Sequence, residues 1–401
     1  MTAPLREPMV LPAPPATLGA ATALLDSYRP GDRFVATPRR TLLGEGVVAE
    51  VPHDARPLTE RVREVLTAAR DLTGDDAAGT VVLGSVPFSP DAPPALAVPA
   101  ALRTAPALRE DPLIALPTPE GPRHAWQVRE VPSAAEYGRA VTDAAARIRA
   151  GEFDKVVLAR TLELTSGREP DLPLMLRRLA RRDPGGYTFA VPTGPARTLI
   201  GASPELLVSR RGTTLVANPL AGSLPRSADL AEDVRRANTL LESPKDLHEH
   251  AVVVEAVRAA LAPFCTRLDV PERPTLVNTA AMWHLSTTVT GELADPGTTA
   301  LDLASALHPT PAVCGTPTGL AREVIAGYEP FDRGAYTGMV GWQDASGDGE
   351  WVVTIRCAEA EGALLRLFAG AGIVGASSAE AETAETAAKF RTFLTAVGAS
   401  L

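Results

Sequence analysis

An alternation of apolar and other positions near the C-terminus predicts a hairpin. In residues 351–358 (WVVTIRCA) the side chains alternate with a period of two, and most positions on both faces are apolar, a pattern typical of a strand buried on both sides. We therefore expect Arg356 to be a charge placed inside a sheet. Glu361-Gly362 predicts the turn, and residues 364–369 predict the return strand. The glycines in the run from Gly370 to Gly375 would let the backbone approach another group closely.

The same stretch continues into a predicted helix that gathers charged side chains on one face. Ser377 with Glu380 has the spacing of a capping box, which predicts the start of the helix. Glu382, Glu385 and Lys389 follow at i, i+3 and i+7 and therefore share a face. Two carboxylates, a lysine, the strand arginine and backbone amides would then converge. A purely structural explanation stays open, because acidic residues in a first turn favour the helix dipole and Glu385 with Lys389 is an ordinary i, i+4 pair.

Apolar periodicity and turn residues predict the elements of the first third of the chain. Prolines recur too often between residues 87 and 122 for regular structure, so we expect edge strands and loops there. The other expected elements are a short helical pattern in a Pro- and Ala-rich start (1–30), a strand pair within 34–51 around Gly44-Glu45-Gly46, a helix at 56–72 and a strand at 80–86.

Helix and strand patterns alternate in the rest of the chain. Ser133 with Glu136 forms a second capping box, and Gly151 occupies the C′ position of the helix that it opens. We expect strands at 155–164, at 187–193 and around His284, a meander across 198–223 that turns at Arg211-Gly212, and helices at 171–182, 229–242, 244–261, 299–307 and from Pro317 onward with Thr316 as the cap.

The composition is that of a soluble globular protein with room for a large core, since 45% of the 401 residues are hydrophobic and 22% are charged. A net charge of −9 argues against nucleic acid as a partner. Residues 1–25 contain no cationic segment leading into a compact apolar stretch, and no apolar run approaches a membrane span, so we expect a cytoplasmic protein. Cys265, Cys314 and Cys357 lack the spacing of a disulfide framework or a metal site, and we expect core residues.

Lysine is rare in this chain. Of the 39 basic residues only Lys155, Lys245 and Lys389 are lysine, and all others are arginine. Burial can convert lysine to a neutral, proton-accepting form that a guanidinium does not reach. Each lysine is therefore a candidate for a role that arginine cannot perform. For any one of the three positions, however, the presence of lysine by chance stays plausible.

Two residues at the start of predicted strands are candidates for proton transfer. A lysine at the first position of a strand is usually solvated, and this alternative stays open for Lys155. Glu205 lies between Pro204 and Leu206 at the start of an apolar strand, where desolvation would raise its pKa. An edge glutamate that faces water is the alternative.

The helix predicted at 244–261 begins with the charged turn KDLHEH. It resembles a zinc protease motif only superficially, because the second histidine would have to lie at position 252, which is Val252. A solvated first turn is one explanation. A hard-cation site fits better than a zinc site if Glu249 meets Glu382 in space.

Many short blocks in this sequence resemble the chorismate-utilising enzymes. Among these enzymes the chain is most similar to the isochorismate synthases that serve catecholate siderophore pathways. The resemblance covers about residues 130–398, whereas the N-terminal third matches only in PRRTLLGEG (38–46). The matching blocks are KVVLAR (155–160), GASPELL (201–207), PLAGS (219–223), SPKDLHEH (243–250), WHL (283–285), HPTPAVCGTP (308–317), EPFDR (329–333), GEWVVTIRCA (349–358) and FAGAGIV (368–374).

The resemblance implies an α+β fold in which two antiparallel sheets are sandwiched between helices, as in anthranilate synthase component I and aminodeoxychorismate synthase. We expect residues 1–401 to form a single chorismate-binding domain. Residues 1–130 would contribute strands and helices, and residues 131–398 would carry the catalytic motifs. We further expect a monomer that acts on a small molecule.

The implied reaction is the Mg²⁺-dependent isomerisation of chorismate to isochorismate, in which water adds at ring C2 while the C4 hydroxyl leaves. By the motifs of the family, Lys155 is the general base that activates water and Glu205 is the general acid that protonates the leaving hydroxyl. These roles require a neutral lysine and a protonated glutamate, which buried surroundings favour.

The resemblance also implies the binding residues. Glu249 and Glu382 would bind Mg²⁺ with Glu385 beside it, which suits an ion that uses only one or two protein carboxylates and keeps several waters. The enolpyruvyl carboxylate would be held by Arg356, Lys389 and the amides of Gly370 to Gly372, and the ring would be lined by Gly222, Ser223, His284 and Ala312.

The sequence departs from the siderophore-type enzymes at two positions. Val313 and Tyr336 stand where Leu and Phe are common, and a tyrosine at that place is similar to relatives that eliminate pyruvate. Ala312, by contrast, is the choice of enzymes without lyase activity. A salicylate synthase therefore remains an alternative, as does a non-catalytic chorismate-binding relative. The aminating relatives are disfavoured because they lack the base lysine.

Overall fold

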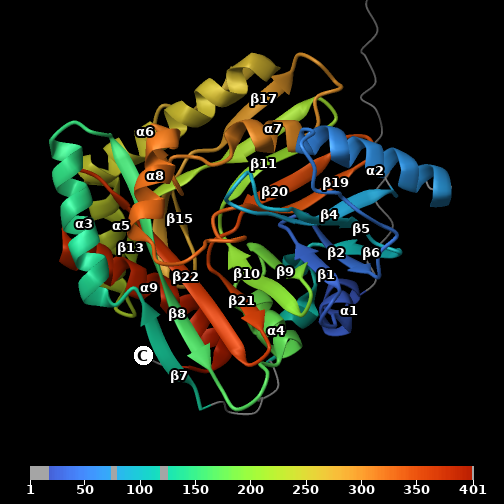
Figure 1. Ribbon diagram of the computed structural model, residues 1–401, viewed down its shortest axis with the longest axis horizontal. Helices are drawn as coiled ribbons and strands as arrows, with labels where there is room; N and C mark the ends of the chain where they lie inside the picture. Colours follow the sequence, from blue (N-terminus) through green and yellow to red (C-terminus); the bar gives the residue numbers. More distant parts are fainter. Residues whose placement is uncertain (1–17, 74–78, 118–124, 400–401) are drawn as a thin grey trace, which may run out of the picture.

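The computed structural model describes residues 18–73, 79–117 and 125–399, and in this part of the chain two large antiparallel sheets pack against each other (Figure 1). Predictions for residues 1–17 and 118–122 lie outside the described residues. The first sheet runs in the order β18 (Gly315–Thr316), β8 (Lys155–Thr165), β22 (Leu364–Ile373), β21 (Cys357–Glu361), β10 (Arg197–Ser203), β9 (Tyr187–Gly194), β1 (Arg33–Ala36), β2 (Arg40–Glu45) and β6 (Ala101–Pro106), with β7 (Gln127–Val131) paired to β8.

The second sheet receives strands from both halves of the chain, and a small sheet lies beside it. The second sheet runs in the order β14 (Cys265–Asp269), β17 (Val289–Leu293), β12 (Thr214–Asn218), β11 (Leu206–Arg211), β20 (Gly349–Val353), β19 (Met339–Asp344), β4 (Val81–Val86), β5 (Ala95–Val98) and β3 (Ala49–Glu50). The small sheet runs in the order β13 (Leu220–Pro225), β16 (Met282–Ser286) and β15 (Thr275–Asn278).

Helices cover the outer faces of both large sheets, and alternation along the strands explains the layers. In β9, Phe189 packs between the two sheets while the next residue, Ala190, faces the helices on the outer side. The first sheet is covered by α1 (Ala20–Ser27), α4 (Leu172–Arg182) and α9 (Ala379–Val397). The second is covered by α2 (Leu58–Thr73), α6 (Pro244–Leu261) and α7 (Ala300–Leu307). Two further helices, α3 (Ala134–Arg149) and α8 (Thr318–Tyr328), pack against β8, and α5 (Leu230–Glu242) packs on the small sheet.

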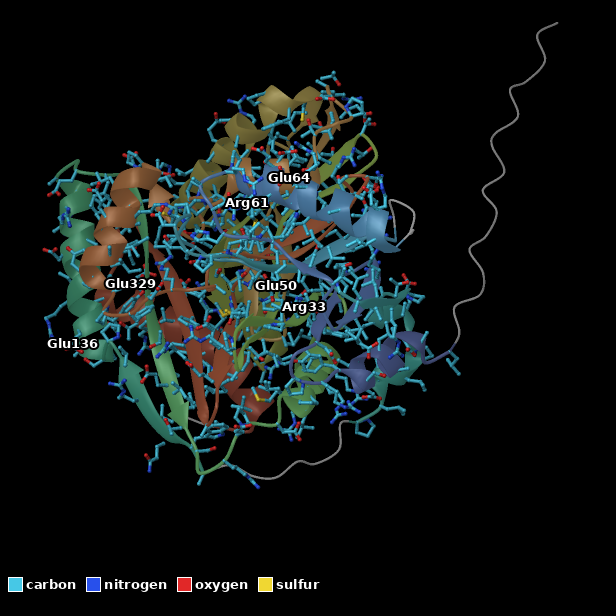
Figure 2. The ribbon with its side chains drawn as sticks, turned by 45° about the vertical axis from the view of Figure 1, so that its right-hand side comes forward. Arg33, Glu50, Arg61, Glu64, Glu136 and Glu329 are labelled. Atoms are coloured by element: carbon cyan, nitrogen blue, oxygen red, sulfur yellow. The ribbon has the colours of Figure 1, made fainter. Side chains whose placement is uncertain are left out.

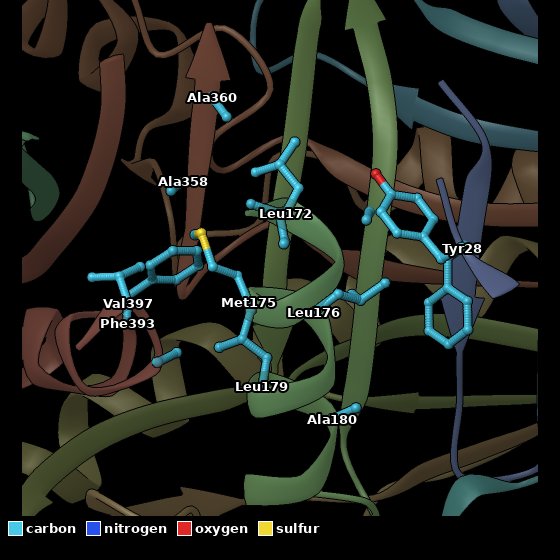
Figure 3. Packing of buried hydrophobic residues seen from close by; sticks show 14 of the residues in the cluster. Tyr28, Leu172, Met175, Leu176, Leu179, Ala180, Ala358, Ala360, Phe393 and Val397 are labelled. Atoms are coloured by element: carbon cyan, nitrogen blue, oxygen red, sulfur yellow. The ribbon is translucent and has the colours of Figure 1, made fainter. Parts of the chain in front are cut away.

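The helix α4 illustrates how the apolar periodicity becomes a core. Asp171 caps its N-terminus by accepting a hydrogen bond from the Leu174 N–H. Its apolar stripe then packs on Tyr28 after α1, on Phe393 and Val397 of α9 and on β21, as Figure 3 shows; the stripe consists of Leu172, Met175, Leu176, Leu179 and Ala180.

The structure confirms the predicted α+β architecture of two antiparallel sheets between helices; the small third sheet was not predicted. The capping box of Ser133 and Glu136 is confirmed, as are the strand that begins at Lys155 and the helices capped by Asp229 and Ser243. In the described part of the chain no helix has both the length and the apolar character needed to cross a membrane.

Several element boundaries differ from the predictions. The chain turns between β1 and β2 at residues 37–39 and not at Gly44–Gly46. The segment 198–223 is not one meander, because β10 belongs to the first sheet and β11 to the second. Helix α9 is capped by Ser378, whereas Ser377 accepts a hydrogen bond from the Val374 N–H. Pro317, not Thr316, is the N-cap of α8.

The prediction of one continuous strand through Arg356 is also wrong. Strand β20 ends at Val353 in the second sheet, β21 begins at Cys357 in the first, and Arg356 lies in the crossover with a φ of 52°. Both neighbouring strands are buried, so apolar alternation continues through the break and conceals it.

Candidate active site

One cavity collects most of the predicted site residues. It lies where the chain crosses between the two large sheets, and segments that are far apart in the sequence form its walls. The predicted residues in its lining are Glu205, Gly222, Ser223, Glu249, His284, Ala312, Arg356, Gly370, Gly372, Glu385 and Lys389. Lys155 and Glu382 are outside this lining but adjoin it, as described below.

Two neighbouring crossovers between the sheets deliver Glu205 and Arg356 to the cavity. Glu205 follows β10, and Arg356 precedes β21. The crossovers are hydrogen bonded to each other, because the Val353 N–H donates to the carbonyl of Glu205 over 3.1 Å and the Ala202 N–H donates to the carbonyl of Arg356 over 3.1 Å. The fold thereby holds an acid and a guanidinium on adjacent backbone segments.

Glu205 is buried, with 3% of its surface exposed, which excludes a glutamate that faces water. Burial raises the pKa of its carboxyl to about 7, although the Leu220 N–H and the positive charges of Lys155, Lys389 and Arg356 oppose this shift. The carboxyl can therefore hold a proton near neutral pH, as a general acid must.

Lys155 is also buried, with 1% of its surface exposed, so the solvated alternative is excluded. Its Nζ lies 2.9 Å from Oε1 of Glu249, which projects from α6. Burial alone would raise the pKa of Glu249, but the charge of Lys155 and its hydrogen bond outweigh burial and lower that pKa. The predicted base and a predicted metal ligand are thus direct partners.

Arg356 presents donors to the cavity, and His284 accepts a hydrogen bond from it. Nη2 of Arg356 lies 3.4 Å from Nε2 of His284, and a guanidinium only donates, so Nε2 of the imidazole carries the lone pair. Nδ1 then carries the proton and donates to Oγ of Ser223 over 2.7 Å. Burial lowers the pKa of Arg356 to about 10 and that of His284 well below its ordinary value. Nη1 of Arg356 is buried without a hydrogen-bond partner among the described residues, as expected of a group that awaits an anion.

The glycines of β22 turn their amides toward the cavity. Gly372 lies opposite Val157 in the ladder, yet the Val157 N–H donates to the carbonyl of Cys314 on the other side of β8. Gly372 and Val157 therefore form a non-hydrogen-bonded pair, in which the backbone N–H and C=O groups of both residues point away from the partner strand. The N–H group of Gly372 is thus directed away from β8, as is that of Gly370 two residues earlier. The carbonyl of Gly370 accepts a hydrogen bond from Nζ of Lys389 over 2.8 Å. The glycines therefore form a wall of the cavity from within a strand.

Each of the three predicted metal-binding carboxylates is paired with one of the three lysines of the sequence. The distances between Nζ and Oε1 are 2.9 Å for Lys155 and Glu249, 2.9 Å for Lys245 and Glu382, and 2.6 Å for Lys389 and Glu385. In the part of the chain that the structure describes, no three acidic, histidine or cysteine side chains converge closely enough to hold a metal ion by themselves.

The donor chemistry nevertheless fits a hard divalent cation. Burial and the neighbouring charge of Glu385 raise the pKa of Glu382, despite the opposing effects of Lys245 and Ser377. Carboxylates that repel each other in a buried site are stabilised by a cation of higher charge. Two of them, completed by water, match the ligand set that Mg²⁺ prefers.

Some wall residues were outside the predicted site. Tyr336 stacks on Phe368 with ring centroids 4.9 Å apart, and both line the cavity with Val157, Val313 and Thr337. In the sequence, Tyr336 and Val313 stand out only as departures from related sequences. Because aromatic and β-branched residues also build ordinary cores, nothing in their sequence pattern marks them as wall residues.

A buried ion pair behind the cavity was also missed. Figure 2 labels Glu329, which follows α8 and receives the Ala159 N–H of β8. Nε of Arg333 donates to Glu329 over 2.8 Å, while its other nitrogens donate to the carbonyls of Val313 and Val157 over 2.8 Å each. Both charged side chains are buried. The i, i+4 spacing of an acid and an arginine in EPFDR is the signal that could have revealed the pair.

Comparisons with known proteins give a consistent result. The sequence profile described as chorismate binding enzyme matches residues 103–398. The isochorismate synthase DhbC of Bacillus subtilis (strain 168) is 51% identical over 389 residues, which are 94% of this chain and 96% of the relative.

Two solved structures are also similar. A 2,3-dihydroxybenzoate-specific isochorismate synthase, DhbC from Bacillus anthracis, has a TM-score of 0.88 at 47% identity and is matched over 95% of this chain and 100% of its own. Anthranilate synthase component I from Streptococcus pneumoniae TIGR4 has a TM-score of 0.69 at 20% identity, over 97% of this chain and 95% of its own, and shares the fold.

Proposed function

The chain belongs to the chorismate-binding enzyme family, and on that premise we propose that it is an isochorismate synthase in which Lys155 and Glu205 move the protons. Water adds at C2 of the chorismate ring, the ring double bond shifts, and the bond between C4 and its hydroxyl breaks. Lys155 accepts a proton from water, and Glu205 gives one to the departing hydroxyl. One water is added and one is lost, so substrate and product are isomers. Lys155 then returns its proton to solvent and Glu205 regains one before the next turnover.

The burial of Lys155 and Glu205 at the same cavity supports these roles most directly. Both side chains are buried at one cavity, and Glu205 has a pKa of about 7, so it is protonated in a substantial fraction of molecules at neutral pH. General acid and base groups each contribute roughly 10²- to 10⁴-fold to a rate when their pKa values lie near the working pH.

The positive groups of the cavity suit a substrate with two carboxylates. We assign the enolpyruvyl carboxylate to Arg356, Lys389 and the amides of Gly370 and Gly372, because charge-assisted hydrogen bonds to carboxylates are strong. The ring would lie against Gly222, Ser223, His284 and Ala312.

Magnesium is part of this proposal. Glu249 and Glu382, with Glu385 beside them, would hold a Mg²⁺ ion that supplies positive charge to the ring carboxylate and competes with Lys155 for Glu249. We further propose that the product enters a catecholate siderophore pathway, because a similar solved structure is 2,3-dihydroxybenzoate-specific, and that the protein acts as a cytoplasmic monomer.

A salicylate synthase is the second candidate. The hydroxyl of Tyr336 lies in the cavity wall beside Gly370, close enough that a Cβ at position 370 would be 2.8 Å from it. A polar group at this place could assist removal of the pyruvyl side chain.

Separation of the reaction products by chromatography tests the proposal. With chorismate and MgCl₂ we expect isochorismate as the main product, and none after EDTA treatment. Salicylate with pyruvate as the main products would support the second candidate instead. No turnover by a protein that binds Mg²⁺ would identify a non-catalytic relative.

A further inference from the structure

We propose that Lys245 is an exchangeable internal counter-ion, which neutralises Glu382 while no divalent cation is bound and leaves the site when one binds. This inference rests on the proposed magnesium dependence. It concerns a residue that is not among the proposed catalytic, substrate-binding or metal-binding groups.

The position of Lys245 in its helix is unfavourable by itself. Ser243 is the N-cap of α6 and Pro244 its first residue, so Lys245 is in the first turn. A cation there opposes the helix dipole, which favours acidic residues at an N-terminus. A negatively charged partner is therefore needed to offset this cost.

That partner is Glu382 in the first turn of α9. Nζ of Lys245 lies 2.9 Å from its Oε1, and the Glu382 side chain is 1% exposed. Burial alone would lower the pKa of Lys245, but the charges of Glu382, Glu249 and Glu385 outweigh burial and raise it. Lys245 thus interacts with the whole group of carboxylates that would bind the metal.

Among the three lysines, Lys245 is the most exposed to solvent. The side chains of Lys155 and Lys389 are 2% and 15% exposed, whereas that of Lys245 is 34% exposed. A flexible lysine stem lets the ammonium turn outward into water. Lys155 and Lys389 are more buried and keep their assigned roles in the cavity.

The charge of Lys245 affects the metal-free and the metal-bound site in opposite ways. Without Lys245 the buried carboxylate of Glu382 would lie beside that of Glu385 with no ammonium of its own. With Lys245 in place, a divalent cation must displace an ammonium to reach Glu382. The same lysine therefore stabilises the metal-free site and weakens metal binding.

Calorimetric titration of the substrate-free protein with MgCl₂ at about pH 8 tests this exchange. Lys245→Met keeps the length of the side chain and removes the competing charge, and we expect it to bind Mg²⁺ about five- to tenfold more tightly than the wild type. Lys245→Arg keeps a charge, and we expect unchanged or weaker binding. Arg235→Met is the matched control, because it removes one positive charge from an ion pair with Glu232 on α5, where the arginine is 70% exposed.

Thermal unfolding of the same variants provides a second readout. Without metal, Lys245→Met should melt at a lower temperature than the wild type, because it leaves a buried carboxylate unpaired. At saturating MgCl₂ the two melting temperatures should coincide. If Lys245→Met does not fold, Lys245→Gln provides the same comparison.

The alternative outcomes are distinct. If the wild type does not bind Mg²⁺, the magnesium proposal and this inference both fail. If the wild type binds it and Lys245→Met binds it equally or less tightly, Lys245 is not a competitor, while the magnesium proposal stands. An equal loss of melting temperature with and without Mg²⁺ would make the ion pair a plain structural contact.

Discussion

The carboxyl of Glu205 illustrates how a single buried group connects stability to chemistry. Its pKa is about 7 in the folded protein against 4.5 as the ordinary value. Below about pH 4.5 the group is neutral in both states. As the pH rises through 7 the folded protein must ionise a buried carboxyl that the unfolded chain ionises in water. The favourable contribution of the neutral form is then lost, at a cost of about 3 kcal/mol.

Glu205→Gln should therefore remove activity and increase stability. Glutamine still accepts a hydrogen bond from the Leu220 N–H but neither donates a proton nor ionises. In urea unfolding at about pH 8 we expect the variant to be up to about 3 kcal/mol more stable than the wild type, and the difference should approach zero near pH 4.5. A stability difference between variant and wild type that is the same at both pH values would contradict the raised pKa.

Lys155→Ala tests the base. We expect turnover to be lost while Mg²⁺ and chorismate still bind, and Lys155→Arg should be inactive as well, because a guanidinium keeps its charge but does not accept a proton. The measurements are product formation and calorimetric binding. Near-normal rates in either variant would remove the base assignment.

The sequence could predict the environment of Glu205 but not that of Lys155. Apolar neighbours on both sides of Glu205 already indicate desolvation. The burial of Lys155 depends on Glu249, which is 94 residues away on α6, and no local pattern records that contact.

At the scale of elements, strand β22 needs glycine where it passes the site. A Cβ at Gly372 would lie 2.4 Å from Oε1 of Glu249 and 3.0 Å from Cε of Lys155. The pair of Lys155 and Glu249 therefore occupies the space that any other residue at position 372 would take.

Gly372→Ala should displace this ion pair. We expect a loss of activity of about 10²-fold or more, in line with the loss of one general base, and weaker Mg²⁺ binding. Gly375→Ala is the matched control, because its Cβ would meet only Cγ of Arg149 at 3.3 Å and Ile148 at 3.7 Å, near the surface. Activity and Mg²⁺ binding are measured for both purified variants. Equal activities would show that the site tolerates a methyl group at position 372.

Elements with a strong local signal could be predicted, and crossings between sheets could not. The helix caps at Ser133 and Asp171 act within three residues, so the sequence contains their full cause. Arg356 lies where the chain leaves one sheet for the other, but burial continues on both sides of it. Apolar alternation reports burial and not which sheet a strand joins. The positive φ of Arg356 is set by the crossover.

The ion pair of Glu329 and Arg333 joins α8, β8 and the loop before β18. Arg333→Met leaves a buried carboxylate unpaired and should destabilise the protein by about 3–5 kcal/mol. It should also raise the KM for chorismate, because Val313 and Val157 line the cavity. Urea unfolding and kinetics measure the two effects.

An exposed ion pair serves as the control for Arg333→Met. Arg258→Met breaks a contact with Glu255 on the surface of α6 and should cost less than about 1 kcal/mol. Similar losses of unfolding free energy in Arg333→Met and Arg258→Met would contradict the larger contribution of the buried pair to stability.

At the scale of the whole molecule, the site forms where the chain crosses twice between the two large sheets. The chain passes from the first sheet to the second at Glu205 and from the second back to the first at Arg356, and these two crossovers are hydrogen bonded to each other. Helices α6 and α9 then bring Glu249, Glu382 and Glu385 to the same place from outside the sheets. Local periodicity already predicted that the carboxylates and lysine of α9 converge with Arg356. The resemblance to chorismate-utilising enzymes added the roles of Lys155 and Glu205 and implied the α+β fold.

Turnover of chorismate in water enriched in ¹⁸O tests the central claim most directly. If water activated by Lys155 adds at C2, mass spectrometry should find isochorismate that carries one ¹⁸O in its C2 hydroxyl, and Lys155→Ala should form none. Isochorismate without the label, or salicylate and pyruvate as the main products, would contradict the account.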